Sequence, residues 1–600
     1  MDSDPVHFRS LQASFLENFR RYGDEPAILF LEADTCRPQS YRAFGDICTS
    51  VAHGLLQRGI KPGDRAVILS QNRPEWAYAD IGALLAGCVT SAIYPQSLSA
   101  EIAYILNDLE ARVLFMEDEA QLEKLLPVRD MIPSLAHVFV FSGRMKEDIP
   151  GVFRFEALLE ATAENQERLD EIARSHRPHD PLCIIYTSGT TGVPKGVVLT
   201  QQNYLATMAS VLEVIPDHAQ VRRYLSFLPL AHAFERMVGH YFLFYLGRAV
   251  GYAERMETII DNCKLVRPNL LAAVPRFFEK VHSRIQNGLQ EASWLKRGLF
   301  QWALRVGERR NRKQKRGERP NLLNRLEHAL AERLIYRKVQ AAFGGDVRYF
   351  VSGGAPLNPM VGEFFQALGM IVLEGWGATE VTAPACINRP WDNRIGTVGP
   401  AIPGVEVRLA ADGELEVKGP NVFKGYWRKP QETREAFTAD GYYRTGDIGT
   451  IAADGWVRIT GRKKELIITA GGKNVAPAAI VQLLINQPHI DMAYIHGDRR
   501  KYLTALLVPD AAALAHSARQ LHLPGETLPE LLAHPQLRET IDREVQEANR
   551  QLPRFMQVRY YRILAEPFSV ENGELTHTLK LRTEIVEEKY KQLLDSMYDE

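Results

Sequence analysis

Segments with a helical spacing of apolar residues alternate with short apolar runs along most of the first 400 residues. Residues 41–59 show the helical spacing and end on Gly59, and residues 65–70 (RAVILS) then form a strand-like run. The alternation continues over residues 74–117 and resumes at 224–230, 270–275 and 347–356. Because successive strand–helix units build parallel sheets covered by helices, the pattern predicts an α/β fold.

The chain is too long for a single hydrophobic core, so we expect more than one domain. From about residue 395 the pattern changes to short strands separated by glycine turns, which predicts a small β-barrel. After residue 461 a further strand–helix pattern begins. We therefore predict an N-terminal domain of several subdomains over residues 1–461, a hinge at 462–464 and a smaller, mobile α+β domain over 465–600. A helical, strongly basic insertion is expected within the first domain at about 283–340.

Charge and cysteine content argue against several classes of protein. The chain has 72 Lys and Arg against 73 Asp and Glu, whereas a nucleic-acid-binding domain is usually basic. Six cysteines are scattered without a CxxC pair or a histidine at metal-ligand spacing, which favours a reduced, intracellular protein. The N-terminal residues lack the apolar core of a signal peptide. The most apolar stretch, residues 76–95, contains Asp80 and ends at Pro95, so we expect a buried helix followed by a strand there rather than a membrane span.

One segment, IIYTSGTTGVPKGVVLT at residues 184–200, places hydroxyl side chains, glycines and one lysine between two apolar runs. Glycine-rich turns offer backbone N–H groups to anions, and a lysine adds a mobile positive charge. A Walker A loop does not fit, because Gly189 and Gly192 are too close together and a strand-like run follows Lys195 where a helix should begin. A flexible hairpin rich in turn formers is the simpler alternative for such a segment. The candidate phosphate ligands are Thr187, Ser188, Gly189, Thr190, Thr191, Gly192 and Lys195.

The string YTSGTTGVPKG resembles the phosphate-binding loop of the adenylate-forming superfamily, which includes acyl-CoA synthetases, luciferase-like enzymes and peptide-synthetase adenylation domains. In that family the loop holds the β- and γ-phosphates of ATP. Further motifs follow in the family's order over almost the whole chain: FVSGGAPLNP (350–359), LEGWGATE (373–380), YRTGD (443–447) and GRKKEL (461–466). Each motif alone would fit an ordinary turn, helix cap or linker, but the common order favours the family.

The resemblance implies a nucleotide pocket in the N-terminal domain. Trp376 matches an aromatic residue at the adenine site that is usually tyrosine in the family. Thr379 would reach the α-phosphate, and Glu380 would bind Mg²⁺ together with Thr187, since this ion prefers oxygen ligands. The pocket would comprise Gly353, Gly354, Ala355, Glu374, Gly375, Trp376, Gly377, Ala378 and Thr379.

Later motifs would complete the site. Asp447 would accept hydrogen bonds from the ribose, and Arg462 would contact the ribose or a phosphate. Lys464 matches the family's hinge residue, and Gly471 and Gly472 would line a narrow slot for the pantetheine of CoA.

The catalytic lysine of the family matches Lys580 in GELTHTLKLRT (573–583). This string departs from the family pattern, because His577 replaces a proline of the long-chain variant and no glycine precedes the lysine. The departure leaves open a catalytically silent protein that binds a nucleotide or an acyl chain.

The resemblance implies an ATP-dependent, Mg²⁺-requiring ligase that forms acyl-AMP and then, with CoA, acyl-CoA. Residues 226–247 and 270–281 resemble the long-chain branch, so a long-chain fatty acid is the expected substrate. His232 is expected at the mouth of the acyl pocket and joins Lys195, Glu380 and Lys580 as a catalytic candidate. The apolar and aromatic run Phe234–Tyr245 either lines an acyl tunnel or, as such stripes more often do, packs in the core.

Alternatives at the level of activity are an acyl-AMP ligase that supplies a carrier protein, a ligase for aromatic or other non-fatty acids, and a P-loop phosphotransferase. The basic residues Arg309–Arg319 form either a solvated helix–loop, the favoured interpretation, or a patch attracted to anionic lipid. We expect a cytoplasmic protein, with peripheral contact to the inner membrane face as an option. No nucleic-acid partner is expected, and both a monomer and a homodimer remain open.

Overall fold

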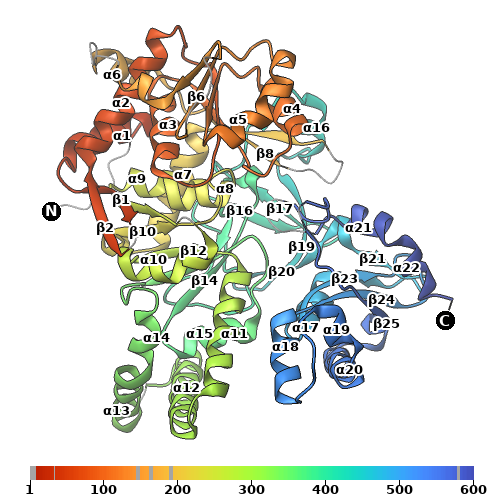
Figure 1. Ribbon diagram of the computed structural model, residues 1–600. Helices are drawn as coiled ribbons and strands as arrows, with labels where there is room; N and C mark the ends of the chain where they lie inside the picture. The colour runs from red at the N-terminus through yellow and green to blue at the C-terminus, as the bar shows by residue number, and fades with distance from the viewer. Residues whose placement is uncertain are drawn as a thin grey trace. The chain divides into compact units, whose positions relative to one another are not determined.

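The computed structural model describes residues 8–32, 34–143, 149–160, 166–187, 193–253, 255–319, 321–569, 571–576 and 581–599. The chain divides into two compact units (Figure 1). Unit 1 comprises residues 1–408, 416–444 and 451–457, and unit 2 comprises 409–415, 445–450 and 458–600. The predicted hinge at 462–464 follows closely on Arg458, where the continuous part of unit 2 begins, and its role as a hinge stays a prediction.

An eight-stranded sheet, sheet A, forms one layer of unit 1 in the described chain. Its strands, in spatial order, are β15 (Cys386–Ile387), β14 (Ile371–Trp376), β13 (Tyr349–Ser352), β12 (Leu270–Ala273), β10 (Arg223–Ser226), β11 (Ala249–Tyr252), β1 (Pro26–Glu32) and β2 (Thr35–Ser40). Neighbours from β14 to β1 run parallel, and β15 and β2 are antiparallel to the strands they flank.

A second eight-stranded sheet, sheet B, forms another layer of the described part of unit 1. Its strands, in spatial order, are β18 (Gly425–Tyr426), β9 (Lys195–Thr200), β8 (Pro181–Thr187), β4 (Val89–Ile93), β3 (Arg65–Leu69), β5 (Val113–Met116), β6 (His137–Val140) and β7 (Val152–Arg154). Neighbours from β8 to β7 are parallel, whereas β9 and β18 pair antiparallel. The predicted α/β fold is therefore confirmed, with the difference that strands joined by short connections add antiparallel edges.

The helices of unit 1 surround the two sheets, as the apolar periodicity predicts, except that those at 294–315 and 322–331 pack on each other and the first of them packs on the helix at 359–367. They are α1 (Leu11–Arg21), α2 (Tyr41–Gln57), α3 (Pro74–Leu85), α4 (Ser99–Leu109), α5 (Glu119–Leu125), α6 (Gln166–Ser175), α7 (Gln201–Val214), α8 (Ala233–Glu235), α9 (Phe242–Tyr245), α10 (Ile259–Val266), α11 (Pro275–Glu291), α12 (Trp294–Lys315), α13 (Leu322–Ala331), α14 (Arg337–Ala341), α15 (Pro359–Ala367) and α16 (Pro430–Glu435). Among the described residues, none of the helices combines the length and the apolar character that crossing a bilayer requires.

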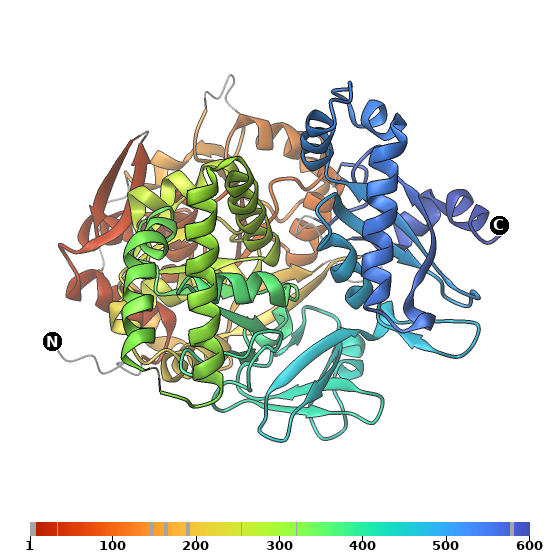
Figure 2. The same ribbon diagram turned by 90° about the horizontal axis from the view of Figure 1, so that it is seen from below.

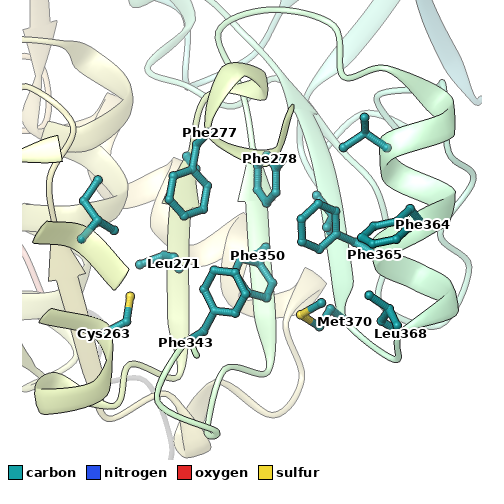
Figure 3. Close-up of a cluster of buried hydrophobic side chains, with 14 of the residues drawn as sticks. Cys263, Leu271, Phe277, Phe278, Phe343, Phe350, Phe364, Phe365, Leu368 and Met370 are labelled. Carbon is teal, nitrogen blue, oxygen red and sulfur yellow. The ribbon is translucent and has the colours of Figure 1, made fainter. Parts of the chain in front are cut away.

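One face of sheet A is closed by an aromatic core. Figure 3 shows Phe277 and Phe278 of α11 beside Phe350 of β13 and Phe365 of α15. The Phe278 ring lies 5.9 Å from that of Phe350 and 5.6 Å from that of Phe365, both edge to face. Such contacts add to the burial of large apolar area. The cluster fixes the strands whose carboxyl ends carry two of the predicted nucleotide motifs.

Smaller sheets follow sheet A along the chain. Strands β16 (Glu406–Leu409), β17 (Glu414–Lys418), β19 (Tyr443–Ile451) and β20 (Val457–Arg462) form a four-stranded sheet where the sequence predicts a small barrel. Unit 2 contains the hairpin of β21 (Ile467–Ile468) and β22 (Asn474–Val475) and a sheet of β23 (Ile490–His496), β24 (Leu503–Pro509) and β25 (Val558–Ile563). Its helices are α17 (Pro477–Ile485), α18 (Ala511–Gln520), α19 (Leu528–Ala533), α20 (Pro535–Arg550), α21 (Thr583–Lys589) and α22 (Lys591–Ser596).

Candidate active site

The predicted phosphate loop joins two antiparallel strands. Thr187 at the end of β8 pairs with Lys195 at the start of β9, so the hydroxyl and the ammonium-bearing side chain come from paired positions. A strand follows Lys195, as predicted, and this connection differs from a Walker A loop, which leads into a helix. The loop residues Ser188, Gly189, Thr190, Thr191 and Gly192 lie outside the described residues.

Tyr426 connects the two predicted charged ligands of the phosphates. Its hydroxyl donates to Glu380 Oε1 at 3.0 Å, and Lys195 Nζ lies 5.3 Å from the centre of its ring. Burial, followed by the Glu380 carboxylate, raises the pKa of Tyr426, so the phenol remains a protonated donor. Tyr426 thus has a cation over its ring and a carboxylate at its hydroxyl.

Backbone pairing fixes this arrangement from both sheets. The β18 residue Tyr426 pairs with Val197 of β9, and the Trp427 N–H donates to the Gly196 carbonyl at 2.7 Å. On the other side, the Phe423 N–H donates to the Glu380 carbonyl at 2.8 Å. Segment 423–427 therefore brings Lys195 of sheet B and Glu380, which follows β14 of sheet A, to one place.

The turn after β13 is shaped by close contacts. Gly354 has a φ of +85°, which favours glycine, and a Cβ on Gly353 would lie 3.2 Å from the Phe234 ring. Phe234 belongs to α8, whose N-cap is His232; the His232 Nδ1 accepts from the Phe234 N–H at 3.3 Å. The structure thus brings the His232 segment beside the predicted adenine turn, where Gly353 is buried against Phe234 and Gly354 and Ala355 are exposed.

Glu374 is buried and its carboxylate is engaged by backbone. Its Oε1 accepts from the Gly396 N–H at 2.8 Å and its Oε2 from the Leu357 N–H at 3.3 Å. These bonds tie β14 to the turn after β13, because Leu357 belongs to that turn. Whether Glu374 also touches a nucleotide stays a prediction; in this geometry its carboxylate orients the turn.

The rest of the GWGATE motif forms the carboxyl end of β14. Trp376 is buried and pairs with Cys386, and Thr379 begins the 3₁₀ turn η7 (Thr379–Val381) that presents Glu380. A Cβ on Gly377 would lie 3.2 Å from three backbone atoms of residues 383–385, so only glycine fits there without movement. Carboxyl ends of parallel strands are the usual place for ligands in α/β sheets. The predicted residues Gly375 and Ala378 lie in the same stretch.

In unit 2, Asp447 and Arg462 form an ion pair. Arg462 Nε lies 3.0 Å from Asp447 Oδ1, and the carboxylate is buried while the guanidinium is half exposed. Lys464 lies exposed in the 3₁₀ turn η8 (Lys463–Glu465), and its neighbour Lys463 pairs with Asp412 and Glu414 at 2.6 and 2.8 Å. The structure therefore brings the predicted ribose ligands together.

The predicted CoA and catalytic-lysine loops also belong to unit 2. Gly471 and Gly472 lie exposed in the turn between β21 and β22, where Gly472 has a φ of +71°. Lys580 lies outside the described residues. Residues on both sides of its loop are described: Leu575 and Leu581 form an isolated β-bridge, and the buried Glu574 carboxylate accepts from Lys589 Nζ and the Tyr590 hydroxyl, each at 2.8 Å.

A buried charged network lies beside His232. Asp80 pairs with Arg236 and, at 3.1 Å, with His240 Nε2, and all three side chains have no exposed area. Burial alone would raise the pKa of Asp80, but Arg236 and then His240 lower it to about 2. Asp80 belongs to α3, whereas Arg236 and His240 lie in the π-helical turn η4 (Arg236–Tyr241), a conformation that is frequent at functional sites.

Glu235, next to this network, is fully buried, and no cation forms an ion pair with it among the described residues. Its carboxylate accepts from the Tyr224 hydroxyl at 2.8 Å and the Ser226 hydroxyl at 2.6 Å. Burial raises the pKa of Glu235 to about 8, with the two hydroxyls opposing the rise. The sequence analysis missed both Glu235 and the Asp80 network; charged residues inside an apolar, aromatic run are the signal that could have pointed to them.

The aromatic run that could have lined an acyl tunnel packs in the core. Tyr241 stacks near Phe15 and meets Tyr204 edge to face, while the Phe244 ring lies 4.9 Å from that of Phe44. Met237 and Phe242 are also buried. Of the two interpretations of this run, packing in the core therefore describes these side chains, and lining an acyl tunnel does not.

Comparison with known proteins identifies the family of this chain. The sequence profile of the AMP-binding enzymes matches residues 15–427, and that of the AMP-binding enzyme C-terminal domain matches residues 464–600. The chain belongs to the AMP-binding enzyme family. It is 37% identical over 553 residues to the long-chain-fatty-acid–CoA ligase FadD15 of Mycobacterium bovis, covering 92% of this chain and 90% of the relative. The mouse long-chain-fatty-acid–CoA ligase ACSBG1 is 31% identical over 617 residues, covering 98% of this chain and 85% of the relative.

Solved structures agree on the fold. The adenylation domain of a carboxylate reductase from Mycobacterium chelonae superimposes with a TM-score of 0.75 at 20% identity, covering 98% of this chain and 91% of that one. The anthranilate CoA ligase AuaEII in complex with anthranoyl-AMP gives a TM-score of 0.74 at 18% identity, covering 99% and 100%. The predicted fold is therefore confirmed, and the family profiles and the relatives above confirm the predicted superfamily.

Proposed function

We propose that this AMP-binding enzyme activates long-chain fatty acids in two steps. A fatty carboxylate attacks the α-phosphorus of ATP and expels pyrophosphate, which gives acyl-AMP. The thiol of CoA, losing its proton, then attacks the acyl carbonyl and expels AMP. The observation that best supports this proposal is the arrangement of Lys195, Tyr426 and Glu380, which offers a cation and an oxygen ligand to one polyphosphate. The long-chain acid rests on the likeness to long-chain-fatty-acid–CoA ligases.

The first step needs positioning and charge neutralisation rather than a base, because a carboxylic acid with a pKa near ~4 is already ionised at neutral pH. Lys195 neutralises the outer phosphates. The Tyr426 ring holds the Lys195 ammonium in position, because the pairing of β18 with β9 fixes the ring. Lys580 supplies a second cation between the carboxylate and the α-phosphate.

Magnesium suits the donors present. Among the described residues there is no cluster of three or more His, Cys, Asp or Glu side chains that could hold a metal by themselves. Mg²⁺ is usually bound by one or two carboxylates together with substrate phosphates, so the Glu380 carboxylate, with the Thr187 hydroxyl, fits this mode. When bound, the ion supplies neutralisation of phosphate charge.

The second step needs a different set of residues. We propose that unit 2 rotates about Lys464. This rotation moves Lys580 away from the reacting groups and presents the Gly471–Gly472 turn to CoA. Motions of this size occur in microseconds to milliseconds. We further propose that the protein works in the cytoplasm.

The test is release of pyrophosphate and AMP with ATP, Mg²⁺ and acids from acetate to oleate, with and without CoA. Turnover with long acids that yields a thioester only with CoA supports the proposal. Adenylate formation that ignores CoA would identify an acyl-AMP ligase, and ADP as product would identify a phosphotransferase. Lys195→Met and Glu380→Gln should each reduce pyrophosphate release at least a hundredfold, whereas Lys418→Met, on an exposed strand end, serves as the control.

A further inference from the structure

We propose that the hairpin of α12 and α13 docks on an anionic phospholipid surface, with the exposed leucines of α13 entering the lipid and phosphate headgroups bound beside them. The two helices lie at the end of unit 1 that is at the foot of Figure 1 and faces the viewer in Figure 2. This inference rests on the hairpin itself and is independent of the proposed reaction.

The helix α13 has its apolar side turned outward. Leu322, Leu323, Leu326 and Leu330 are exposed by 74, 64, 62 and 50%, and their spacing places them on one stripe of the helix. Monomeric proteins rarely leave such contiguous apolar surface in water. The stripe therefore indicates a surface that is covered in use.

Polar side chains of α13 face α12 instead. Glu327 pairs with Arg309 at 3.0 Å, and Asn324 accepts from Lys313 Nζ at 2.6 Å. These contacts fix the rotation of α13, because turning the leucines inward would break both. The outward stripe is thus a consequence of specific pairing rather than of a loosely placed helix.

Charge around the stripe is strongly positive. Residues 294–338 contain 14 Lys and Arg against 4 Asp and Glu, a net charge of +10 in a chain whose total is −1. Amphipathic helices that lie in a membrane interface combine an apolar face with basic residues, and each cation near an anionic surface contributes favourably. A second copy of the chain would bring the same positive charge to the contact, so self-association through this face is disfavoured.

A basic pocket opens between the two helices. Its volume is about 370 Å³, and its lining is Val306, Arg309, Arg310, Lys313, Asn324, Arg325 and Glu327. No ion pair or hydrogen bond joins the side chain of Arg310 or Arg325 to another described residue. Arg325 lies three residues after Leu322 on the helix surface, so a lipid whose headgroup phosphate is held in the pocket has its apolar part within reach of the stripe.

The base of the hairpin is rigid. A Cβ on Gly307 of α12 would lie 1.9 Å from the Ala367 carbonyl oxygen of α15. The backbones of α12 and α15 therefore approach each other closely at Gly307. The Tyr336 hydroxyl donates to the Ala303 carbonyl at 2.7 Å. The hairpin therefore presents its leucines from a fixed support.

The experiment is vesicle co-sedimentation of the full chain with phosphatidylglycerol and, separately, phosphatidylcholine vesicles. We expect binding to the anionic vesicles alone. Leu322→Asn/Leu323→Asn/Leu326→Asn should weaken it at least tenfold, because apolar area no longer enters the lipid. Arg310→Gln/Arg325→Gln should weaken it about thirtyfold, since two cations are lost.

Matched controls separate docking from general effects. Leu98→Asn removes a leucine that is 75% exposed elsewhere, and Arg154→Gln/Arg519→Gln removes two exposed charges. Both control proteins should bind vesicles within twofold of the parent. The far-UV circular dichroism and the thermal unfolding midpoint in the absence of vesicles should be unchanged in every variant, which shows that the fold is intact and keeps this test apart from that of the reaction.

Several results would overturn the proposal. One is a parent protein that does not sediment with anionic vesicles, or leucine variants that bind as tightly as the parent. Another is light scattering that shows a dimer dissociated by the leucine changes, which would assign the stripe to self-association. A third is inorganic phosphate binding lost with the arginines while vesicle binding persists, which would identify a soluble-anion site.

Discussion

Replacing Glu235 by glutamine should remove a pH dependence of stability that the buried carboxyl group creates. Burial raises the pKa of Glu235 from 4.5 to about 8. Between these values the folded protein retains a proton that the unfolded chain has lost, so the stability contributed by this group is full below pH 4.5 and is lost as the pH rises through 8. Each pH unit corresponds to about 1.4 kcal/mol, and the full interval to about 5 kcal/mol.

The assay compares urea unfolding of the parent and Glu235→Gln at pH 5.5 and 7.5. Over that interval the free energy of unfolding of the parent should fall by about 2.5 kcal/mol relative to the variant, because the amide does not titrate. Tryptophan fluorescence is a suitable signal, since all seven tryptophans lie in unit 1 together with Glu235. Glu213→Gln, at an exposed position of α7, is the control and should show no such difference. A constant difference between parent and Glu235→Gln across this pH range would refute the assignment of a protonated carboxyl.

Three further substitutions test other parts of the structure. Asp80→Ala should lower the free energy of unfolding by about 3–5 kcal/mol, because Arg236 stays buried without its counterion; a loss below 1 kcal/mol in urea titration would contradict the pairing. Tyr426→Phe should lower kcat/KM for ATP at least tenfold by removing the bond to Glu380, with unchanged circular dichroism; full activity would show that this bond does not orient the ligand. Glu574→Gln should weaken adenylation tenfold or more, because it loosens the described residues beside the loop of Lys580, the predicted catalytic lysine, yet it should leave thioester formation from supplied acyl-AMP intact; equal losses in both half-reactions would indicate a general folding defect.

Local patterns in the sequence predict most of the elements but not their neighbours. The strand-like runs at 65–70 and 270–275 are β3 and β12, and the apolar stretch 76–95 is the helix α3 followed by β4. Their order across the sheets depends on long-range pairing, which period and composition do not encode. The antiparallel pairing of β18 with β9 was missed for this reason, whereas β2, β9 and β15 each pair with the strand that precedes them in the chain.

The same limit applies to the candidate site. Motif strings predict Lys195 and Glu380, because the residues around each are local. Tyr426, which joins the two, enters through the pairing of β18 with β9, whose residues are far apart in the chain. Nothing in the string around it differs from an ordinary aromatic strand end, so only the fold identifies its role.

In helix α13, the pattern of apolar residues predicts the helix correctly but not the side of it that is buried. Leucines at 322, 323, 326 and 330 predict an amphipathic helix, and periodicity alone would turn that stripe toward the core. The structure turns it outward because the opposite stripe carries Glu327 and Asn324, which meet Arg309 and Lys313 of α12. The periodicity of apolar residues therefore determines that a helix forms, whereas the charges on the neighbouring helix determine which side is buried. In α13 the apolar periodicity and the charges of α12 favour burial of opposite sides. The apolar side is left exposed, and it is this side that the proposed lipid surface would cover.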